Sequence, residues 1–172
     1  MRPIRAACLG TATALVTLLA SAPVAAAATD TAPVHAKGGD RVITLFGQLA
    51  KQTRFPINPS GDPAQGDRTA FRSVLYYDED ETQVAGETNG TCTTTWAPDV
   101  DHQAEVCVVT YTLPGGQLTV QGMIFGNLTA TPPPPFDNAI TGGTGVFDRA
   151  RGMVHAETVG PGKRRFTIDL DN

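Results

Sequence analysis

The stretch AITGGTGVFDRARG, from Ala139 to Gly152, contains four glycines in fourteen residues and ends beside two cations, Arg149 and Arg151. A glycine-rich run next to arginines has two common explanations. It can cradle a phosphate with its backbone N–H groups at the start of a helix. It can also form tight backbone corners in a small β-barrel, because glycine adopts positive φ without steric cost.

The spacing within this stretch favours the backbone corners. A dinucleotide fingerprint requires a third glycine where Asp148 stands, followed by a helix, and neither is found. A phosphate-binding loop also requires a lysine that is missing here. We therefore expect Gly142, Gly143 and Gly145 to permit positive φ and Phe147 to pack inward beneath the corner.

The segments around this stretch have the composition of β-strands. Val, Thr and aromatic residues recur in short runs between turn signals, and no run of helical length shows helical periodicity. Many short strands at this spacing are typical of a barrel or a sandwich. The eight expected strands span 42–49, 69–77, 82–96, 104–113, 117–130, 138–141, 152–158 and 164–170, with a proline-rich loop at 131–135.

The first 28 residues have the pattern of a secretory signal peptide. Arg2 and Arg5 precede an apolar run that is too short to span a membrane comfortably, and small residues follow it. Residues 29–40 are polar and predict a flexible mature N-terminus. The sequence thus predicts a secreted, extracellular protein whose single β-barrel domain comprises residues 41–172.

The charge balance argues against two classes of partner. Removal of Arg2 and Arg5 with the signal leaves 11 of the 13 basic residues beside all 17 acidic ones, a formal charge of −6. An acidic domain is a poor candidate for binding nucleic acid or an anionic membrane. We expect no nucleic-acid partner and no membrane span.

Two cysteines remain after the signal, and their spacing suits a hairpin. A turn at APDVDH, residues 97–102, places Cys92 opposite Cys107 and Tyr111 opposite Thr88. An even pair in an oxidising compartment predicts a disulfide. The alternative is that Cys92 is a free thiol in a cavity.

With the strands placed, the chain resembles the allene oxide cyclase and dirigent superfamily. GQLTVQG followed by AITGGTGVFDRARG resembles the superfamily's signature, and FRSVLYYD, NGTC and RRFTIDL resemble its other strands in the same order. The resemblance covers residues 42–170. It implies an all-β, eight-stranded antiparallel β-barrel with an apolar cavity, often assembled as a homotrimer, that needs no metal and no organic cofactor.

The resemblance also implies a function. Allene oxide cyclases close a reactive fatty-acid epoxide into a cyclopentenone, an isomerase reaction, and dirigent proteins steer phenoxy radicals or quinone methides to one stereoisomer. We therefore expect a barrel that binds a small apolar or phenolic molecule and steers its cyclisation or coupling. The alternatives are a non-catalytic, lipocalin-like small-molecule binder and a cell-surface structural protein.

The cyclase resemblance points to five residues for ligand binding. Gln48 is the polar side chain nearest to the position of the cyclases' acidic residue, and Ser73 stands at their asparagine. Phe125 lies near the position of their tyrosine. Phe71 belongs to the aromatic strand and Phe147 to the signature. Because the acid and the tyrosine are replaced, the sequence leaves open whether the chain is an enzyme.

The dirigent resemblance points to Arg151, Asp148 and Tyr111 as catalytic candidates. Dirigent proteins use acidic and basic residues at the cavity, and Arg151 matches the arginine of the Ala-Arg-Gly motif. The alternative for Arg151 is a structural arginine that pairs with Asp148 or with a carbonyl near the corner. No three residues have the spacing of a zinc site, so we expect no metal.

Overall fold

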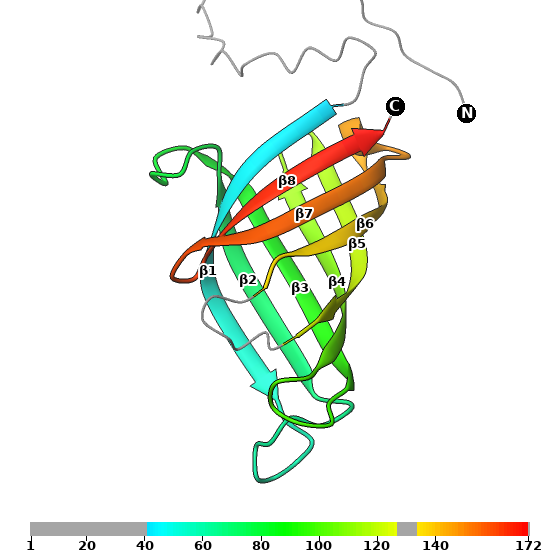
Figure 1. Ribbon diagram of the computed structural model, residues 1–172. Coiled ribbons are helices and arrows are strands. Elements are labelled where there is room, and N and C mark those ends of the chain that lie inside the picture. The colour runs from blue at the N-terminus through cyan, green and yellow to red at the C-terminus, as the bar shows by residue number, and fades with distance from the viewer. Residues whose placement is uncertain (1–40, 127–133, 172) are drawn as a thin grey trace, which may run out of the picture. The chain divides into compact units, whose positions relative to one another are not determined.

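The computed structural model describes residues 41–126 and 134–171, which form a closed, eight-stranded antiparallel barrel (Figure 1). Each strand pairs with its neighbours in the sequence, and β8 pairs with β1 to close the barrel. The expected fold class is confirmed. The strands are β1 (Arg41–Phe55), β2 (Arg68–Tyr76), β3 (Val84–Trp96), β4 (Ala104–Leu113), β5 (Gly116–Phe125), β6 (Phe136–Gly143), β7 (Arg151–Gly160) and β8 (Lys163–Asp171).

Some of the elements expected from the sequence lie in residues that the structure does not describe. The predicted signal peptide at 1–28 and the N-terminal segment at 29–40 lie outside the described residues. So do the last residues of the strand expected at 117–130 and part of the proline-rich loop. Within the described ranges, no helix is long and apolar enough to cross a membrane.

The expectation that the first strand ends at Leu49 is wrong, because β1 continues to Phe55. The register with β2 shifts between Leu49 and Lys51, which inserts one extra residue into β1 as a β-bulge. Side chains alternate between the two faces of a strand, so one extra residue exchanges the faces. Before the bulge Leu49 lines the interior of the barrel, and after it Gln52 and Arg54 do.

The register of β3 and β4 agrees with the prediction. Cys92 lies opposite Cys107 and Thr88 opposite Tyr111. The two sulfur atoms are bonded at 1.97 Å, so the disulfide is confirmed and Cys92 is not a free thiol. Residues two positions from Cys107 share its face of β4. Glu105 and Val109 therefore also point into the barrel.

The glycine-rich stretch forms the corner between β6 and β7, in part by other means than expected. Gly145 has φ +63° and begins the short 3₁₀ helix η1 (Gly145–Phe147), while Phe147 is 4% exposed in the core. The expectation of positive φ at Gly142 and Gly143 is wrong. Gly143 is required for close approach instead, because a Cβ there would lie 2.5 Å from the Phe147 carbonyl oxygen.

Apolar side chains fill one part of the barrel interior and leave another part open. Leu45, Leu75, Leu118 and Ile168 are fully buried in one cluster, which Phe147 also joins. Further along the same strands, the inward-facing side chains do not fill the space between the opposite walls of the barrel. The unfilled part is the candidate functional site.

Candidate functional site

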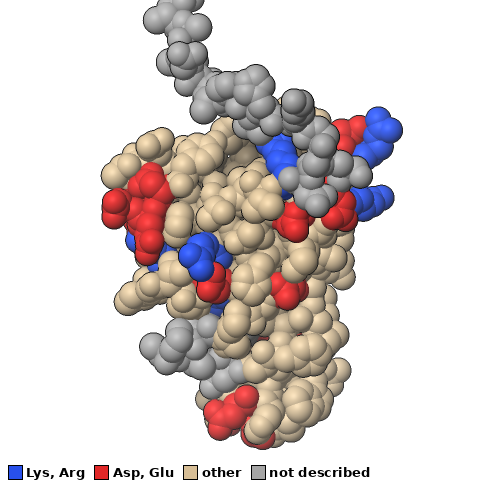
Figure 2. Space-filling view, turned by 45° about the horizontal axis from the view of Figure 1, so that its top comes forward, with Lys and Arg blue, Asp and Glu red and all other residues tan. Residues whose placement is uncertain are grey.

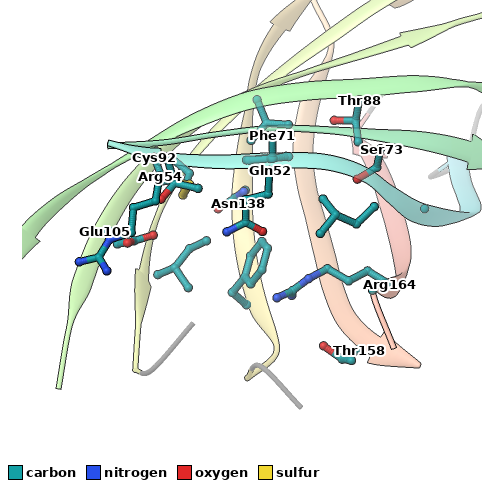
Figure 3. A pocket seen from close by; sticks show the side chains of 18 of the residues that line it. Gln52, Arg54, Phe71, Ser73, Thr88, Cys92, Glu105, Asn138, Thr158 and Arg164 are labelled. Atoms are coloured by element: carbon teal, nitrogen blue, oxygen red, sulfur yellow. A yellow bond between two sulfur atoms is a disulfide. The ribbon is translucent and has the colours of Figure 1, made fainter. Parts of the chain in front are cut away.

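The barrel encloses a cavity of about 480 Å³ (Figure 3). Its wall consists of inward-facing residues of the strands, and parts of the β1–β2, β3–β4 and β7–β8 connections also border it. The lining combines aromatic and aliphatic side chains with polar and charged ones. The aromatic and polar strand residues of the lining are Gln52, Arg54, Thr69, Phe71, Ser73, Thr88, Glu105, Tyr111, Phe136, Asn138, Thr158, Lys163, Arg164 and Phe166.

Two aromatic side chains form the inner wall. Tyr111 on β4 packs edge-to-face against Phe166 on β8, with ring centroids 5.5 Å apart. Tyr111 is 2% exposed, and this burial raises the pKa of its hydroxyl well above the usual range, while the charge of Arg164 acts in the opposite direction. The phenol therefore stays protonated and can donate a hydrogen bond into the cavity.

Arg164 lies on the same face of β8 as Phe166 and Ile168, so the strand directs a guanidinium group into the barrel interior. The guanidinium carbon lies 4.8 Å from the centroid of the Phe136 ring. Its Nη1 atom is buried and has no hydrogen-bond partner among the described residues. Burial lowers the pKa of Arg164, against the influence of Tyr111, yet an arginine remains charged.

Four other arginines of the described residues have carboxylate partners. Arg72 lies 2.7 Å from Glu87, and Arg165, the next residue to Arg164, pairs with Glu157 on the outer surface. On the face shown in Figure 2, basic side chains lie beside acidic ones. No ion pair between Arg164 and an acidic residue occurs in residues 41–126 and 134–171. Arg164 is therefore a cavity-facing cation whose charge no nearby carboxylate balances.

Glu105 on β4 is the cavity's half-buried carboxyl group. Burial raises its pKa, while a hydrogen bond from the Thr94 hydroxyl at 3.3 Å and the charge of Arg54 lower it in part. In Figure 3, Glu105 and Arg54 lie on one side of the cavity and Arg164 on the other. A carboxyl group with a raised pKa is suited to proton transfer closer to neutral pH.

The loop between β1 and β2 borders the cavity and is fixed by Asp67. This carboxylate is 2% exposed and accepts hydrogen bonds from Arg54 Nη2 at 2.5 Å, from the Ile57 N–H at 2.7 Å and from the Ala64 N–H at 3.1 Å. Gly61 through Pro63, in the middle of the loop, line the cavity. The position of this wall thus depends on one buried acid.

The predicted ligand-binding residues divide into two groups. Phe71 and Ser73 line the cavity, as do Tyr111 and the disulfide between Cys92 and Cys107. The other three do not line it: Gln48 precedes the bulge on the outward face of β1, Phe125 is 65% exposed, and Phe147 belongs to the filled core.

Two of the predicted catalytic residues lie away from the cavity. Asp148 and Arg151 belong to the corner between β6 and β7, and neither lines the cavity. Asp148 pairs with Arg149 at 3.2 Å, and Arg151 Nη1 donates to the Ala150 carbonyl oxygen at 3.3 Å. These contacts fit the structural alternative for Arg151.

One group of potential metal ligands occurs in the described part of the chain. The sulfur atoms of Cys92 and Cys107 and a carboxylate oxygen of Glu105 lie within 4.8 Å of one another. Because the two sulfur atoms are bonded to each other, they are not thiolates and do not suit a metal.

Comparison with known proteins agrees with this architecture. The family model described as "Allene oxide cyclase barrel like domain" matches residues 49–169. No curated protein sequence shows significant similarity to the chain.

Solved structures share the barrel at low sequence identity. A pyocyanin demethylase is 23% identical, with a TM-score of 0.63 over 76% of this chain and 99% of that one. An exo-specific intermolecular Diels–Alderase is 14% identical, with a TM-score of 0.60 over 77% of this chain and 98% of that one. A pterocarpan synthase dirigent protein is 19% identical, with a TM-score of 0.57 over 77% of this chain and 86% of that one.

Proposed function

The chain belongs to the allene oxide cyclase barrel-like family. We propose that its barrel binds a small apolar or phenolic molecule and steers the cyclisation or coupling of that molecule. The observation that carries the proposal is the cavity of about 480 Å³, whose wall combines aromatic and aliphatic side chains with polar ones. Small-molecule sites have this size and use polar groups on an apolar wall to orient the ligand. A cavity that fixes the relative orientation of reacting atoms accelerates one outcome without covalent catalysis.

The similar structures support the reaction class. A Diels–Alderase and a dirigent protein are among them, and each is built on the same barrel. In the proposed reaction, aromatic side chains such as Phe71 and Phe166 hold the ring or chain of the substrate. Glu105 transfers a proton where the reaction requires one, because its raised pKa suits that role.

A second candidate is non-catalytic binding of the same kind of molecule. It is favoured by the position of Asp148 and Arg151, because the acid–base pair that the dirigent resemblance implied lies outside the cavity. In this case the cavity retains its ligand unchanged.

Filling the cavity is expected to abolish binding. Val109 is 6% exposed and lines the cavity, whereas its neighbour Val108 is 50% exposed on the outer face of β4. We expect Val109→Phe to weaken binding of the neutral probe N-phenylnaphthylamine at least about tenfold, and Val108→Phe to leave binding unchanged. Fluorescence titration measures both. If the wild-type protein binds no probe, the cavity is inaccessible and a structural role replaces the proposal.

Steering is tested separately from binding. Coniferyl alcohol, a phenolic radical precursor, is oxidised by a one-electron oxidant with and without the protein, and chiral chromatography measures the product. The proposal predicts an excess of one enantiomer that Val109→Phe removes. A racemic product from a protein that binds the probe tightly would support the non-catalytic alternative for this class of substrate.

Export and assembly form part of the proposal. We propose that residues 1–28 direct export, and the disulfide supports an oxidising compartment. We also propose a homotrimer, as the family resemblance suggests. Native mass spectrometry of protein collected from the culture supernatant of its host measures signal removal, the disulfide, the number of subunits and any retained small molecule.

A further inference from the structure

Three buried polar atoms of the cavity lining lack hydrogen-bond partners among the described residues: Nη1 of Arg164, Oγ1 of Thr88 and the amide Oδ1 of Asn138. Of these, Arg164 carries the charge. Thr88 on β3 lies directly opposite Tyr111 on β4, and Tyr111 interacts electrostatically with Arg164. Figure 3 shows Thr88 and Arg164 on the same side of the cavity. A guanidinium and two hydroxyls therefore belong to one region.

From this cluster we propose that the cavity has a carboxylate subsite, at which Arg164 binds the acid group of a planar, conjugated carboxylic acid. The proposal rests on the proposed small-molecule function and names the chemical class of the ligand. It assigns Arg164 the role of anchoring the ligand, with the hydroxyls of Tyr111 and Thr88 as further donors.

The charge of Arg164 selects an anion. A buried charged donor without a partner is costly, and a ligand that supplies the missing acceptor removes that cost. Other cations of the lining are already paired: Arg54 with Asp67 at 2.5 Å, and Lys163 with Glu81 at 2.7 Å. Arg164 is thus the lining cation that is left to attract an acid group.

The geometry of the guanidinium favours a carboxylate over a phenol. The planar fork of arginine matches the two oxygens of a carboxylate, and charge-assisted bonds of this kind are strong. A carboxylic acid is ionised at neutral pH, whereas a free phenol with a pKa of about 10 is not. A neutral phenol would leave the charge of Arg164 unbalanced.

The surrounding rings favour a flat ligand and fix its direction. Phe136 already lies against the Arg164 guanidinium, and Phe71 and Phe166 line the same cavity. Glu105 lies on the side opposite Arg164 in Figure 3. A carboxylate therefore binds with its acid group at Arg164 and its apolar part toward Glu105, because like charges repel.

Cinnamate and cinnamamide test the proposal, because they share a shape and differ in charge. Isothermal titration calorimetry at neutral pH should show that the wild-type full chain binds cinnamate at least about tenfold more tightly than cinnamamide. Arg164→Met should reduce this ratio to about one, and Arg164→Lys should retain part of it. Arg165→Met, on the outer face of the same strand, should leave the ratio unchanged.

Each contrary outcome has a distinct meaning. Equal binding of both probes by the wild-type protein would overturn the carboxylate subsite and leave small-molecule binding intact. Binding of neither probe would overturn the subsite and also count against the proposed function. A preference for cinnamate that persists in Arg164→Met would assign the anion to another cation. If Arg164→Met does not fold, Arg164→Gln replaces it, and the wild-type ratio remains decisive.

Discussion

Asp67→Ala is expected to lower the free energy of unfolding by about 3 kcal/mol. The Asp67 carboxylate is almost completely buried and accepts three hydrogen bonds, one from Arg54 and two from the backbone N–H groups of Ile57 and Ala64. Alanine removes the acceptor from all three donors. Chemical denaturation of the two proteins under identical conditions measures the difference.

The size of this effect follows from what each donor loses. Arg54 is partly exposed, so water replaces part of the interaction that it loses. Its contribution to the lost free energy of unfolding is therefore smaller than that of a fully buried arginine. The two backbone N–H groups belong to a loop whose position the carboxylate fixes, and a hydrogen bond to a charged group contributes about 1.5–3 kcal/mol. We therefore expect the loop to detach locally before the barrel unfolds.

Asp67 should also make the stability of the protein depend on pH. Burial alone would raise the pKa of Asp67, but the hydrogen bonds from Ile57, Arg54 and Ala64 and the charge of Arg54 together lower it below the usual range. A group whose pKa is lower in the folded state stabilises the fold above its unfolded pKa and loses this contribution as the pH falls. The stability difference between wild type and Asp67→Ala should therefore shrink below about pH 4.

Asp62→Ala is the matched control for Asp67→Ala. Asp62 is exposed in the same loop and accepts a hydrogen bond from the Ser60 hydroxyl at 2.6 Å. Surface substitutions of this kind change stability by less than about 0.5 kcal/mol. If Asp67→Ala and Asp62→Ala were equally mild, the buried carboxylate would not be what holds the loop.

Much of the fold was predictable because strand alternation is visible in the sequence. The β3–β4 hairpin could be placed from the turn at residues 97–102 and the cysteine spacing, and this register put Tyr111 opposite Thr88. The same alternation would have identified Glu105, which shares a face with Cys107, and Arg164, which shares a face with Phe166 and Ile168. These two residues were missed because charged side chains are usually assigned to the outer face.

Other parts of the site were not predictable from alternation. The bulge in β1 has no clear sequence signal, yet it decides that Gln52 and not Gln48 belongs to the site. Arg151 and Asp148 were singled out by a motif, and motifs do not reveal which part of a barrel stays unfilled. That depends on how far the apolar cluster around Phe147 extends, which is a property of three-dimensional packing.

Loss of the disulfide is expected to destabilise the barrel by about 3 kcal/mol. Cys92 and Cys107 are 15 residues apart, and closing a loop of this length restricts the unfolded chain by about that amount in the chain-entropy model. The bond joins neighbouring strands whose ladder exists on both sides of it, so the folded barrel keeps its register without it. The loss should therefore appear as a lower thermal midpoint of a protein that still folds.

Reduction and substitution give two independent measurements of this effect. Excess reductant should lower the thermal midpoint of the wild-type protein, and the double variant Cys92→Ser, Cys107→Ser should be destabilised to a similar extent and should not respond to reductant. An unchanged midpoint, with both thiols shown by mass spectrometry to be free, would contradict the prediction. Because the disulfide also lines the cavity, comparing N-phenylnaphthylamine binding before and after reduction separates its effect on the site from its effect on the fold.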